Sequence, residues 1–325
     1  MADLEVGIIL RLKSSARYLT QEELGRTLGV PRGEVVTAME ALTGRGYRID
    51  EVPGEGYRLL ETPALLDGCD IRTALAGHVP GREVYTFGKI TSTNDVATAL
   101  ARGGAAEGTL VVAEEQSRGR GRQGRQWHSP PGTGLWFSIV LRPVVEAADC
   151  PAISLAVALG VSGMLRRRHA VKAKIKWPND IMVNGRKICG ILTEGEFIGS
   201  KVSFIVVGVG LNVLTEVEEF PPEIRDIATS LKLESPGVTG RTRVLADLLE
   251  SIEREYSRFC TGGFEEIRQE ILEHSFLVGR LIRVVTGGGE VEGIAHDIDE
   301  VGALIVRKDD GSLERVIAGD VVRVN

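Results

Sequence analysis

The chain of 325 residues has few cysteines and no spacing that would place them in a metal site or a disulfide framework. A zinc ribbon needs Cys-x-x-Cys pairs, and a secreted scaffold needs closely spaced cysteines in a short chain. The four cysteines lie far apart, at Cys69, Cys150, Cys189 and Cys260. We therefore expect ordinary thiols in a reducing cytoplasm and no metal site built from protein ligands.

Positive charge and long hydrophobic runs are also scarce. Lys and Arg number 39 against 45 Asp and Glu, a net charge of −6, which excludes a general nucleic-acid coat or a polybasic membrane binder. The N-terminus carries Asp3 and Glu5 where a signal peptide would carry positive charge. The nearly apolar run 204–214 contains Asn212 and is too short to span a bilayer. These absences predict a cytoplasmic protein with no membrane partner, in which any anion site is local.

Residues 1–63 predict a winged helix-turn-helix domain. An apolar helical stretch over 6–12 precedes Thr20 and Glu23, which form a capping box at the start of a second helix. A turn with glycine and proline over 29–31 separates it from a third helix over 32–42. A β-hairpin follows, turning at Pro53-Gly54-Glu55, and it corresponds to the wing.

Residues 64–276 alternate strands and helices and predict a central α/β domain. Asn184-Gly185 is typical of a two-residue hairpin turn, so the sheet is expected to be mixed or antiparallel and not doubly wound. The expected strands are 110–113, 135–141, 181–183, 187–192 and 202–213, and the expected long helices are 153–168 and 242–260.

Residues 277–325 predict a small C-terminal barrel. Short strands separated by turn residues are typical of such a fold, and they are expected at 280–285, 293–295, 303–306 and 321–324. The chain is therefore expected to be an α+β protein of three domains.

The most unusual segment is 116–127, which holds four arginines and three glycines without an acid. Composition alone favours a solvated basic loop. Three features argue for an anion-binding lid instead. Arginine binds carboxylate and phosphate bidentately, glycine lets the backbone fold closely over a ligand, and the segment leaves a strand and ends in Trp127.

Three further segments are candidates for a site. Lys176 ends an expected strand beside Trp177-Pro178 and could stabilise developing charge, although an exposed strand lysine fits equally well. Ser92-Thr93-Asn94-Asp95 opens a helix, where such residues are simply caps or hold a ligand carbonyl. Gly208-Val209-Gly210-Leu211-Asn212 is not followed by a helix, so it is a poor dinucleotide fingerprint, and no Walker lysine motif is present.

Together these segments resemble the biotin protein ligases, specifically the bifunctional class that also represses the biotin operon. The run G-R-G-R-x-G-R-x-W followed by K-W-P-N-D is highly specific, and the resemblance covers nearly the whole chain. The matching residues are Ser92 to Asn94, Gln116, Gly119 to Arg125, Trp127 to Pro130, Lys176 to Asp180, Lys187 to Leu192 and Gly208 to Asn212. The resemblance implies a winged helix, a ligase domain similar to class II synthetases and an SH3-like barrel.

The resemblance also implies a two-step acyl transfer. Biotin and ATP, with Mg²⁺, would form biotinyl-5′-adenylate, and a lysine of the biotin carboxyl carrier protein of acetyl-CoA carboxylase would then accept biotin. Lys176, Arg120 and Arg122 would be catalytic, and Trp127 and Asn212 would bind the adenylate. The residues expected to bind biotin are Ser92, Thr93, Asn94, Gln116, Arg120, Gly121, Arg122 and Lys176. A homodimer is expected when the adenylate is bound.

Operator DNA is a less secure partner than biotin. Residues 1–62 hold eight Lys or Arg against ten Asp or Glu, a net charge of −2, which is not the footprint of a strong DNA binder. The arginines expected to contact DNA are Arg32, Arg45, Arg48 and Arg58. The resemblance implies an arginine late in the last strand of the barrel, and Arg323 is offset from that position by one residue. A one-residue offset in a strand places the side chain on the opposite face, so Arg323 is left out of the site. The rival interpretations are a lipoate ligase and a transcription regulator that only senses a ligand.

Overall fold

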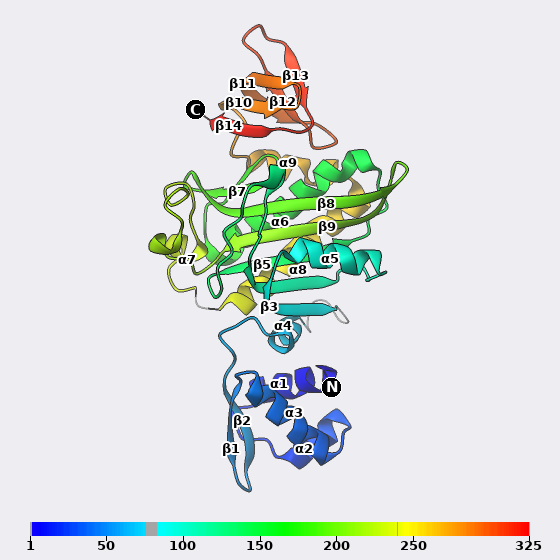
Figure 1. Ribbon diagram of the computed structural model, residues 1–325, viewed down its shortest axis with the longest axis vertical. Helices are drawn as coiled ribbons and strands as arrows, with labels where there is room; N and C mark the ends of the chain where they lie inside the picture. Colours follow the sequence, from blue (N-terminus) through cyan, green and yellow to red (C-terminus); the bar gives the residue numbers. More distant parts are fainter. Residues whose placement is uncertain (1, 76–82, 239, 325) are drawn as a thin grey trace. The chain divides into compact units, whose positions relative to one another are not determined.

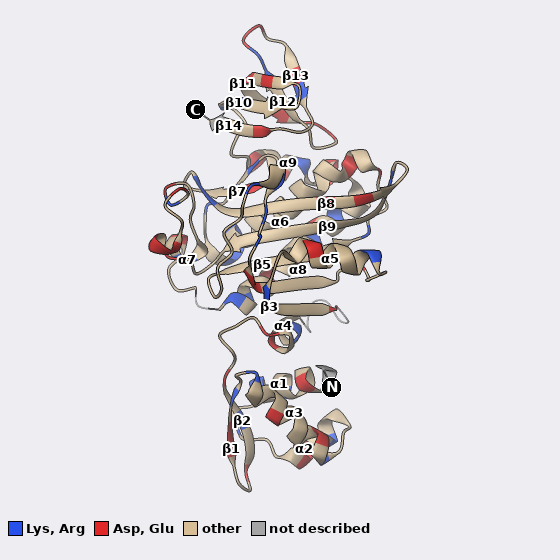
Figure 2. Ribbon diagram, viewed as in Figure 1, with Lys and Arg blue, Asp and Glu red and all other residues tan. Residues whose placement is uncertain are grey.

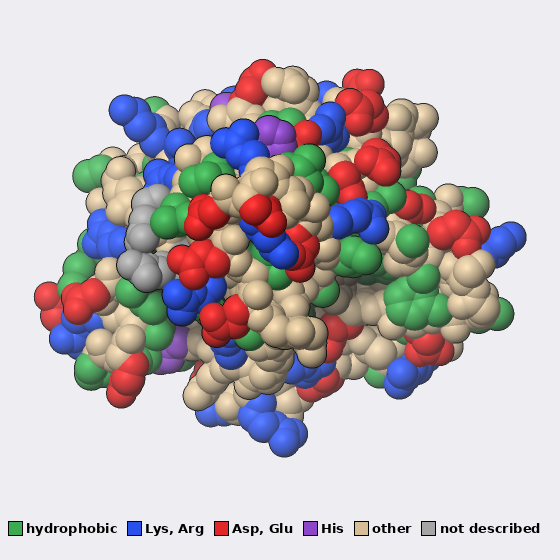
Figure 3. All heavy atoms as spheres, turned by 90° about the horizontal axis from the view of Figure 1, so that it is seen from above, with side chains coloured by type: hydrophobic (Ala, Val, Ile, Leu, Met, Phe, Trp, Pro, Cys, Tyr) green, Lys and Arg blue, Asp and Glu red, His purple; other side chains and the backbone are tan. Residues whose placement is uncertain are grey.

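The computed structural model describes residues 2–75, 83–238 and 240–324 (Figure 1). By its contacts the chain divides into two units, Met1–Thr86 and Phe87–Asn325. In the ribbons of both units, basic and acidic residues are interspersed along the elements (Figure 2). They also alternate on the face of the molecule in Figure 3, where neither sign forms a broad patch.

The first unit contains the three helices and the hairpin that the sequence predicts. Thr20 and Glu23 form the expected capping box, and Gly29 ends the second helix in the left-handed conformation, with φ of 71°. The elements are α1 (Ala2–Lys13), α2 (Gln21–Leu28), α3 (Arg32–Gly44), β1 (Arg48–Val52), β2 (Gly56–Glu61) and α4 (Gly68–Leu75).

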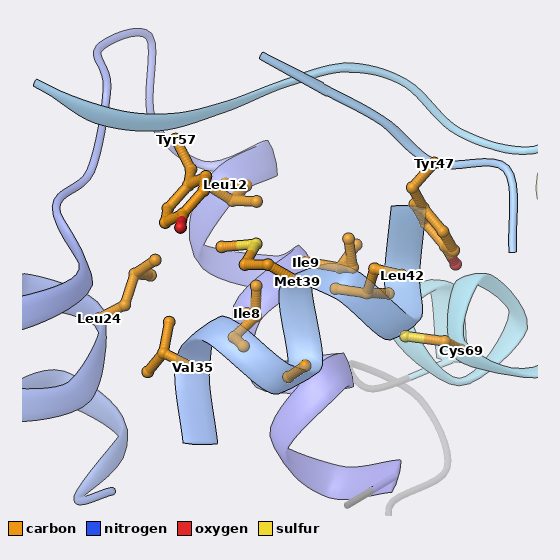
Figure 4. Packing of buried hydrophobic residues seen from close by; sticks show 11 residues of the cluster. Ile8, Ile9, Leu12, Leu24, Val35, Met39, Leu42, Tyr47, Tyr57 and Cys69 are labelled. Carbon is orange, nitrogen blue, oxygen red and sulfur yellow. The ribbon is translucent and has the colours of Figure 1, made fainter. Parts of the chain in front are cut away.

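Helix α4 belongs to the core of this unit, which the sequence did not indicate. Cys69 on α4 is fully buried with Ile9 and Leu42, and Figure 4 shows its sulfur pointing toward the helix that carries Leu42. An ion pair of 2.7 Å between Lys13 and Asp70 also joins α4 to α1. By these contacts, residues 68–75 pack with the N-terminal helices, beyond the boundary expected at residue 63.

The second unit is built on a seven-stranded sheet in the order β3-β4-β5-β9-β8-β7-β6. The pairings from β4 through β6 are antiparallel, and Asn184 and Gly185 form the β7–β8 turn with positive φ, as predicted. The strands are β3 (Val84–Ile90), β4 (Leu110–Gln116), β5 (Gly134–Leu141), β6 (Lys174–Lys176), β7 (Asp180–Val183), β8 (Arg186–Ile198) and β9 (Lys201–Asn212).

Helices cover both faces of this sheet. Side chains alternate along β8, so Glu194 faces α5 (Thr93–Arg102) while Thr193 bonds to Ser154 of α6 (Cys150–His169). Helix α6 packs against α8 (Arg241–Gly262), and α9 (Glu265–Glu273) follows. The stretch 147–169 is long and apolar enough to cross a membrane, but 72% of its apolar window is buried here, so it is a core helix.

A five-stranded antiparallel sheet ends the second unit, in the order β13-β12-β11-β10-β14. The indole of Trp177 donates to the Gly302 carbonyl at 3.0 Å, which ties this sheet to the β6–β7 corner. The sequence missed β13 and most of the length of β11. The strands are β10 (Leu281–Thr286), β11 (Gly289–Ile298), β12 (Leu304–Arg307), β13 (Leu313–Val316) and β14 (Asp320–Val324).

Candidate functional site

A cavity of about 750 Å³ in the second unit brings together the four segments that the sequence singled out. It lies over the sheet face that carries α5, and β14 closes one side of it. The predicted site residues that line it are Ser92, Thr93, Asn94, Gln116, Arg120, Gly121, Arg122, Trp127, Lys176 and Asn212.

Three glycines form the floor of this cavity, and we call Gly190, Gly208 and Gly210 the glycine floor. Gly190 pairs with Gly210 across β8 and β9, and Gly208 lies two residues away on the same face. A Cβ on Gly208 would lie 2.1 Å from the Asn94 Oδ1 atom, and one on Gly210 would lie 2.3 Å from the Trp127 Nε1 atom. Larger residues would therefore displace the side chains that rest on this floor.

A polar cluster occupies one end of the cavity. The Thr93 backbone N–H donates to the Gln116 side-chain carbonyl at 2.8 Å, and the Gln116 amide donates to the Ser129 hydroxyl at 2.9 Å. The buried Ser138 hydroxyl lies 2.7 Å from the Thr93 Oγ1 atom and 2.6 Å from the Asn94 Oδ1 atom. We call Thr93, Asn94, Gln116 and Ser138 the polar cluster.

Helix capping does not account for these residues. Ser92 occupies the N-cap position of α5 and is 3% exposed, but its side chain makes no capping hydrogen bond. The side chains of Thr93 and Asn94 form hydrogen bonds with residues of β4, β5 and β8 and not with the end of the helix. The segment therefore presents fixed donors and acceptors to the cavity, which is the functional interpretation of its sequence.

The arginine loop, residues 117–127, folds back on itself beside the polar cluster. The Gly121 N–H donates to the Arg125 carbonyl at 2.7 Å, and the Trp127 N–H donates to the Gly119 carbonyl at 2.9 Å. Arg120 forms ion pairs of 2.7 Å with Asp95 and 3.0 Å with Glu194. The loop is thus held by specific contacts and is not a fully solvated basic segment.

The other arginines of the loop reach the C-terminal sheet. Arg125 pairs with Asp320 of β14 at 2.6 Å, and Arg122 donates to the Gly319 carbonyl at 3.1 Å. The sequence did not identify Asp320, because 195 residues separate it from Arg125 and it belongs to no local motif. The described part of the second unit therefore encloses the cavity with elements from both ends of its sequence.

Lys176 lies at the end of β6, directly opposite Asp180 of β7. Burial lowers the pKa of its ammonium group, while Asp180 opposes this shift and Lys187 adds to it. Lys187, to which the sequence analysis gave no role in the site, pairs with Asp180 at 2.6 Å and lies 5.2 Å from the Trp127 ring centre. Two ammonium groups and one carboxylate are therefore fixed at this end of the cavity, which suits a reaction that develops negative charge.

Trp127 and Asn212 lie on the glycine floor near this end. The Trp127 ring packs edge-on against Trp136 at 6.3 Å, and its indole N–H is buried with no hydrogen-bond partner. The Asn212 amide donates to the Thr229 carbonyl at 3.0 Å, which fixes the side chain in the wall. In residues 2–75, 83–238 and 240–324, no group of three or more His, Cys, Asp or Glu side chains could hold a metal ion.

The four arginines expected to contact DNA lie in the first unit, and each is ion-paired. Arg32 lies 3.1 Å from Glu22, Arg48 lies 2.6 Å from Glu61, and Arg58 lies 3.6 Å from Asp50. Arg45, at the end of α3, pairs with the buried Glu5 at 3.0 Å. The first three pairs are exposed or half-exposed, whereas Arg45 is part of the packing between α3 and α1.

Comparisons with known proteins agree with this architecture. The biotin/lipoate A/B protein ligase family matches residues 87–212, and the biotin protein ligase C-terminal domain matches residues 277–324. The bifunctional ligase/repressor BirA of Bacillus spizizenii is 34% identical over 309 residues, which is 95% of each chain. The biotin--[acetyl-CoA-carboxylase] ligase of Mycobacterium tuberculosis is 33% identical over 267 residues, 80% of this chain and 96% of its own.

A solved structure extends the agreement to the fold. The biotin protein ligase from Aquifex aeolicus in complex with biotin and ATP superposes with a TM-score of 0.65 at 28% identity. The match covers 75% of this chain and 99% of that one. The chain therefore belongs to the biotin protein ligase family.

Proposed function

We propose that this chain activates biotin with ATP and transfers it to a lysine of the biotin carboxyl carrier protein of acetyl-CoA carboxylase. One observation carries the proposal: a single cavity joins the polar cluster to the charged end at Lys176 across the glycine floor. The polar cluster suits a neutral ureido group, and the charged end suits a carboxylate and a phosphate. The name of the mycobacterial relative supports the choice of carrier.

In the first step, a carboxylate oxygen of biotin attacks the α-phosphorus of ATP and diphosphate leaves. Ser92, Thr93, Asn94 and Gln116 would hold the ureido head by hydrogen bonds, which leaves the carboxylate beside Gly121, Arg122 and Lys176. Holding both reactants in one cavity replaces a bimolecular encounter, and Lys176 would neutralise the charge that develops on the phosphate. Mg²⁺ would enter with ATP as part of the substrate.

In the second step, the amine of the carrier lysine attacks the biotinyl carbonyl and AMP leaves. The mixed anhydride hydrolyses if water reaches it, so the cavity has to exclude water between the steps. Trp127 and the arginine loop would cover the adenylate, and Asn212 would bind the adenine edge. Pyrophosphate release with biotin and ATP tests the proposal, with lipoate and ATP as the control for the rival ligase.

The ligand-dependent protection of the arginine loop is testable by proteolysis. We expect trypsin to cleave the free protein at the arginines between Arg118 and Arg125. The three glycines of the loop make it mobile whenever its ion pairs with Asp320 break. Biotin with ATP should slow this cleavage severalfold. Equal rates with and without ligands would show that the loop does not close on them.

A methyl group on the glycine floor is expected to weaken biotin binding. Gly208→Ala places a Cβ against the Asn94 amide, which has to move away from Ser138 and from the ligand. The loss of one or two hydrogen bonds predicts at least about tenfold weaker binding by titration calorimetry. Gly88→Ala is the matched control, because a Cβ there meets nothing within 4 Å. Unchanged affinity in Gly208→Ala would contradict this placement of the head group.

The N-terminal unit supports a second role as a biotin-dependent repressor. The relative from Bacillus spizizenii carries ligase and repressor in one name, and it matches 95% of this chain. We propose that residues 1–63 form a winged helix that binds operator DNA, that 64–276 form a ligase domain similar to class II synthetases, and that 277–325 form an SH3-like barrel. The adenylate-bound homodimer in the cytoplasm would be the DNA-binding form.

A further inference from the structure

Glu194 of β8 holds together the polar cluster and the arginine loop, and it lies outside the residues that line the cavity. Its Oε2 atom accepts from the Asn94 amide at 2.6 Å and from the Arg120 guanidinium at 3.0 Å, and its Oε1 atom accepts from Arg120 at 3.2 Å. One carboxylate therefore bonds to a residue at the ligand end of α5 and to a residue of the loop.

The contacts of Asn94 show why this matters for ligand binding. Its carbonyl oxygen lies 2.6 Å from the Ser138 hydroxyl, and its amide nitrogen donates to Glu194 and to the Leu192 carbonyl. Gly208 leaves room for this orientation, because any Cβ there would meet the Asn94 oxygen. The Asn94 side chain is thus held from both ends, and Glu194 is the charged partner at one of them.

The contacts of Arg120 show how the loop is included. Its guanidinium lies between two carboxylates, Glu194 and Asp95, and its side chain is 33% exposed. Two negative charges already neutralise this cation, so little attraction is left for a carboxylate or phosphate in the cavity. Arg122 and Lys176 are not held between two close acids in this way. The ion pair of Arg122 with Asp320 is long, at 3.7 Å, and the close partner of Asp180 is Lys187 and not Lys176.

We propose that Glu194 is a positioning residue for biotin, which couples the head-group end of the cavity to the arginine loop through Arg120. In this proposal, Arg120 braces the loop against α5 and β8 and is not itself an anion ligand. A ligand that bonds to Asn94 therefore also stabilises the loop, because both share the Glu194 carboxylate. The inference deepens the proposed function and assigns Glu194 a part in substrate binding.

The test compares Glu194→Gln with Glu196→Gln. Glu196 is a matched control, because it lies two residues further along β8 and also forms an ion pair with α5, with Arg102 at 2.7 Å. No contact among the described residues links Glu196 to Asn94 or to the arginine loop. Glutamine is neutral and replaces one carboxylate oxygen by an NH₂ donor, so it loses the ion pair with Arg120 and at least one of the three hydrogen bonds that Glu194 accepts. We expect the KM for biotin to rise about tenfold in Glu194→Gln, with kcat within about twofold of wild type.

A second measurement needs no substrate and separates this inference from the proposed reaction. In the free protein, trypsin should cleave the arginine loop faster in Glu194→Gln than in wild type or Glu196→Gln, because Arg120 has lost one brace. Combining Glu194→Gln with Arg120→Ala should raise the KM no further than the worse single variant, since both act in one contact. Cleavage and KM equal to those of Glu196→Gln would overturn the proposal, as would a loss of kcat at unchanged KM. Absent pyrophosphate release by wild type would refute the proposed function instead, and the cleavage comparison would still decide the role of Glu194.

Discussion

Lys176→Ala is expected to lose adenylation by about a hundredfold or more while the protein stays folded. A preorganised cation beside a reacting phosphate typically stabilises the transition state by about 3 kcal/mol, because charge grows there as the bond forms. Lys176 is held for this task at the end of β6, opposite Asp180 and half-buried in the cavity wall. Single-turnover release of pyrophosphate from ATP and biotin measures the effect directly.

Controls from the same strand make this result specific. Lys174→Ala removes an exposed lysine of β6, two residues away on the same face, and should leave the rate unchanged. Lys176→Arg keeps the charge and should retain more activity than the alanine variant, though less than wild type, since a guanidinium differs in shape. Full activity in Lys176→Ala would remove this residue from the site.

The direction of the Lys176 pKa shift adds a pH dependence. Burial lowers this pKa, so the ammonium loses its proton at a lower pH than an exposed lysine does. We expect adenylation to decline on the alkaline side as this proton is lost. The decline should be absent in Lys176→Arg, because arginine stays protonated throughout that range.

Local patterns predicted the elements of the fold well. The capping box at Thr20 and Glu23, the Asn184-Gly185 turn and the long helices occur as expected, because each depends on residues close in sequence. The cavity-lining segments were also found, since each carries an unusual local composition. Local signals were therefore sufficient for the list of segments in the site.

Contacts between distant segments could not be predicted in this way. The pairs of Arg125 with Asp320 and of Arg120 with Glu194 join residues 195 and 74 positions apart, and an acid on a strand has no pattern that marks its partner. The packing of α4 with the N-terminal helices could not be predicted for the same reason. Nothing in the sequence around Cys69 indicates which residues it packs against in the core. The role of each arginine depended on these contacts, and not on its motif.

The ion pairs of the first unit predict an unusual response to charge-neutralising variants in DNA binding. Exposed ion pairs typically contribute only about 0–1 kcal/mol, so a phosphate can replace Glu61 as the partner of Arg48 at small cost. Glu61→Gln frees this arginine and should strengthen DNA binding, whereas Arg48→Ala should weaken it. Arg45 is expected to matter for folding and less for DNA, because its partner Glu5 is buried.

The size of the effect follows from the proposed dimer. Each arginine occurs twice on a palindromic site, so Arg48→Ala removes two phosphate contacts and should reduce the salt dependence of binding by about two in log–log slope. Anisotropy titrations on DNA upstream of the organism's biotin genes, with and without biotin and ATP, measure both affinity and slope. Arg283→Ala, on the C-terminal sheet, is the control for a general loss of charge.

Ligand dependence decides whether this DNA binding is regulation. A first unit with net charge −2 over residues 1–62 has little general attraction for phosphate, so a single copy should bind weakly and only the paired form tightly. If the adenylate orders the arginine loop and the ordered loop favours the dimer, biotin with ATP should raise DNA affinity by a factor that Glu194→Gln reduces. Tight DNA binding that is the same with and without biotin and ATP would contradict this coupling. No DNA binding under either condition would show that the chain is a ligase without a repressor function.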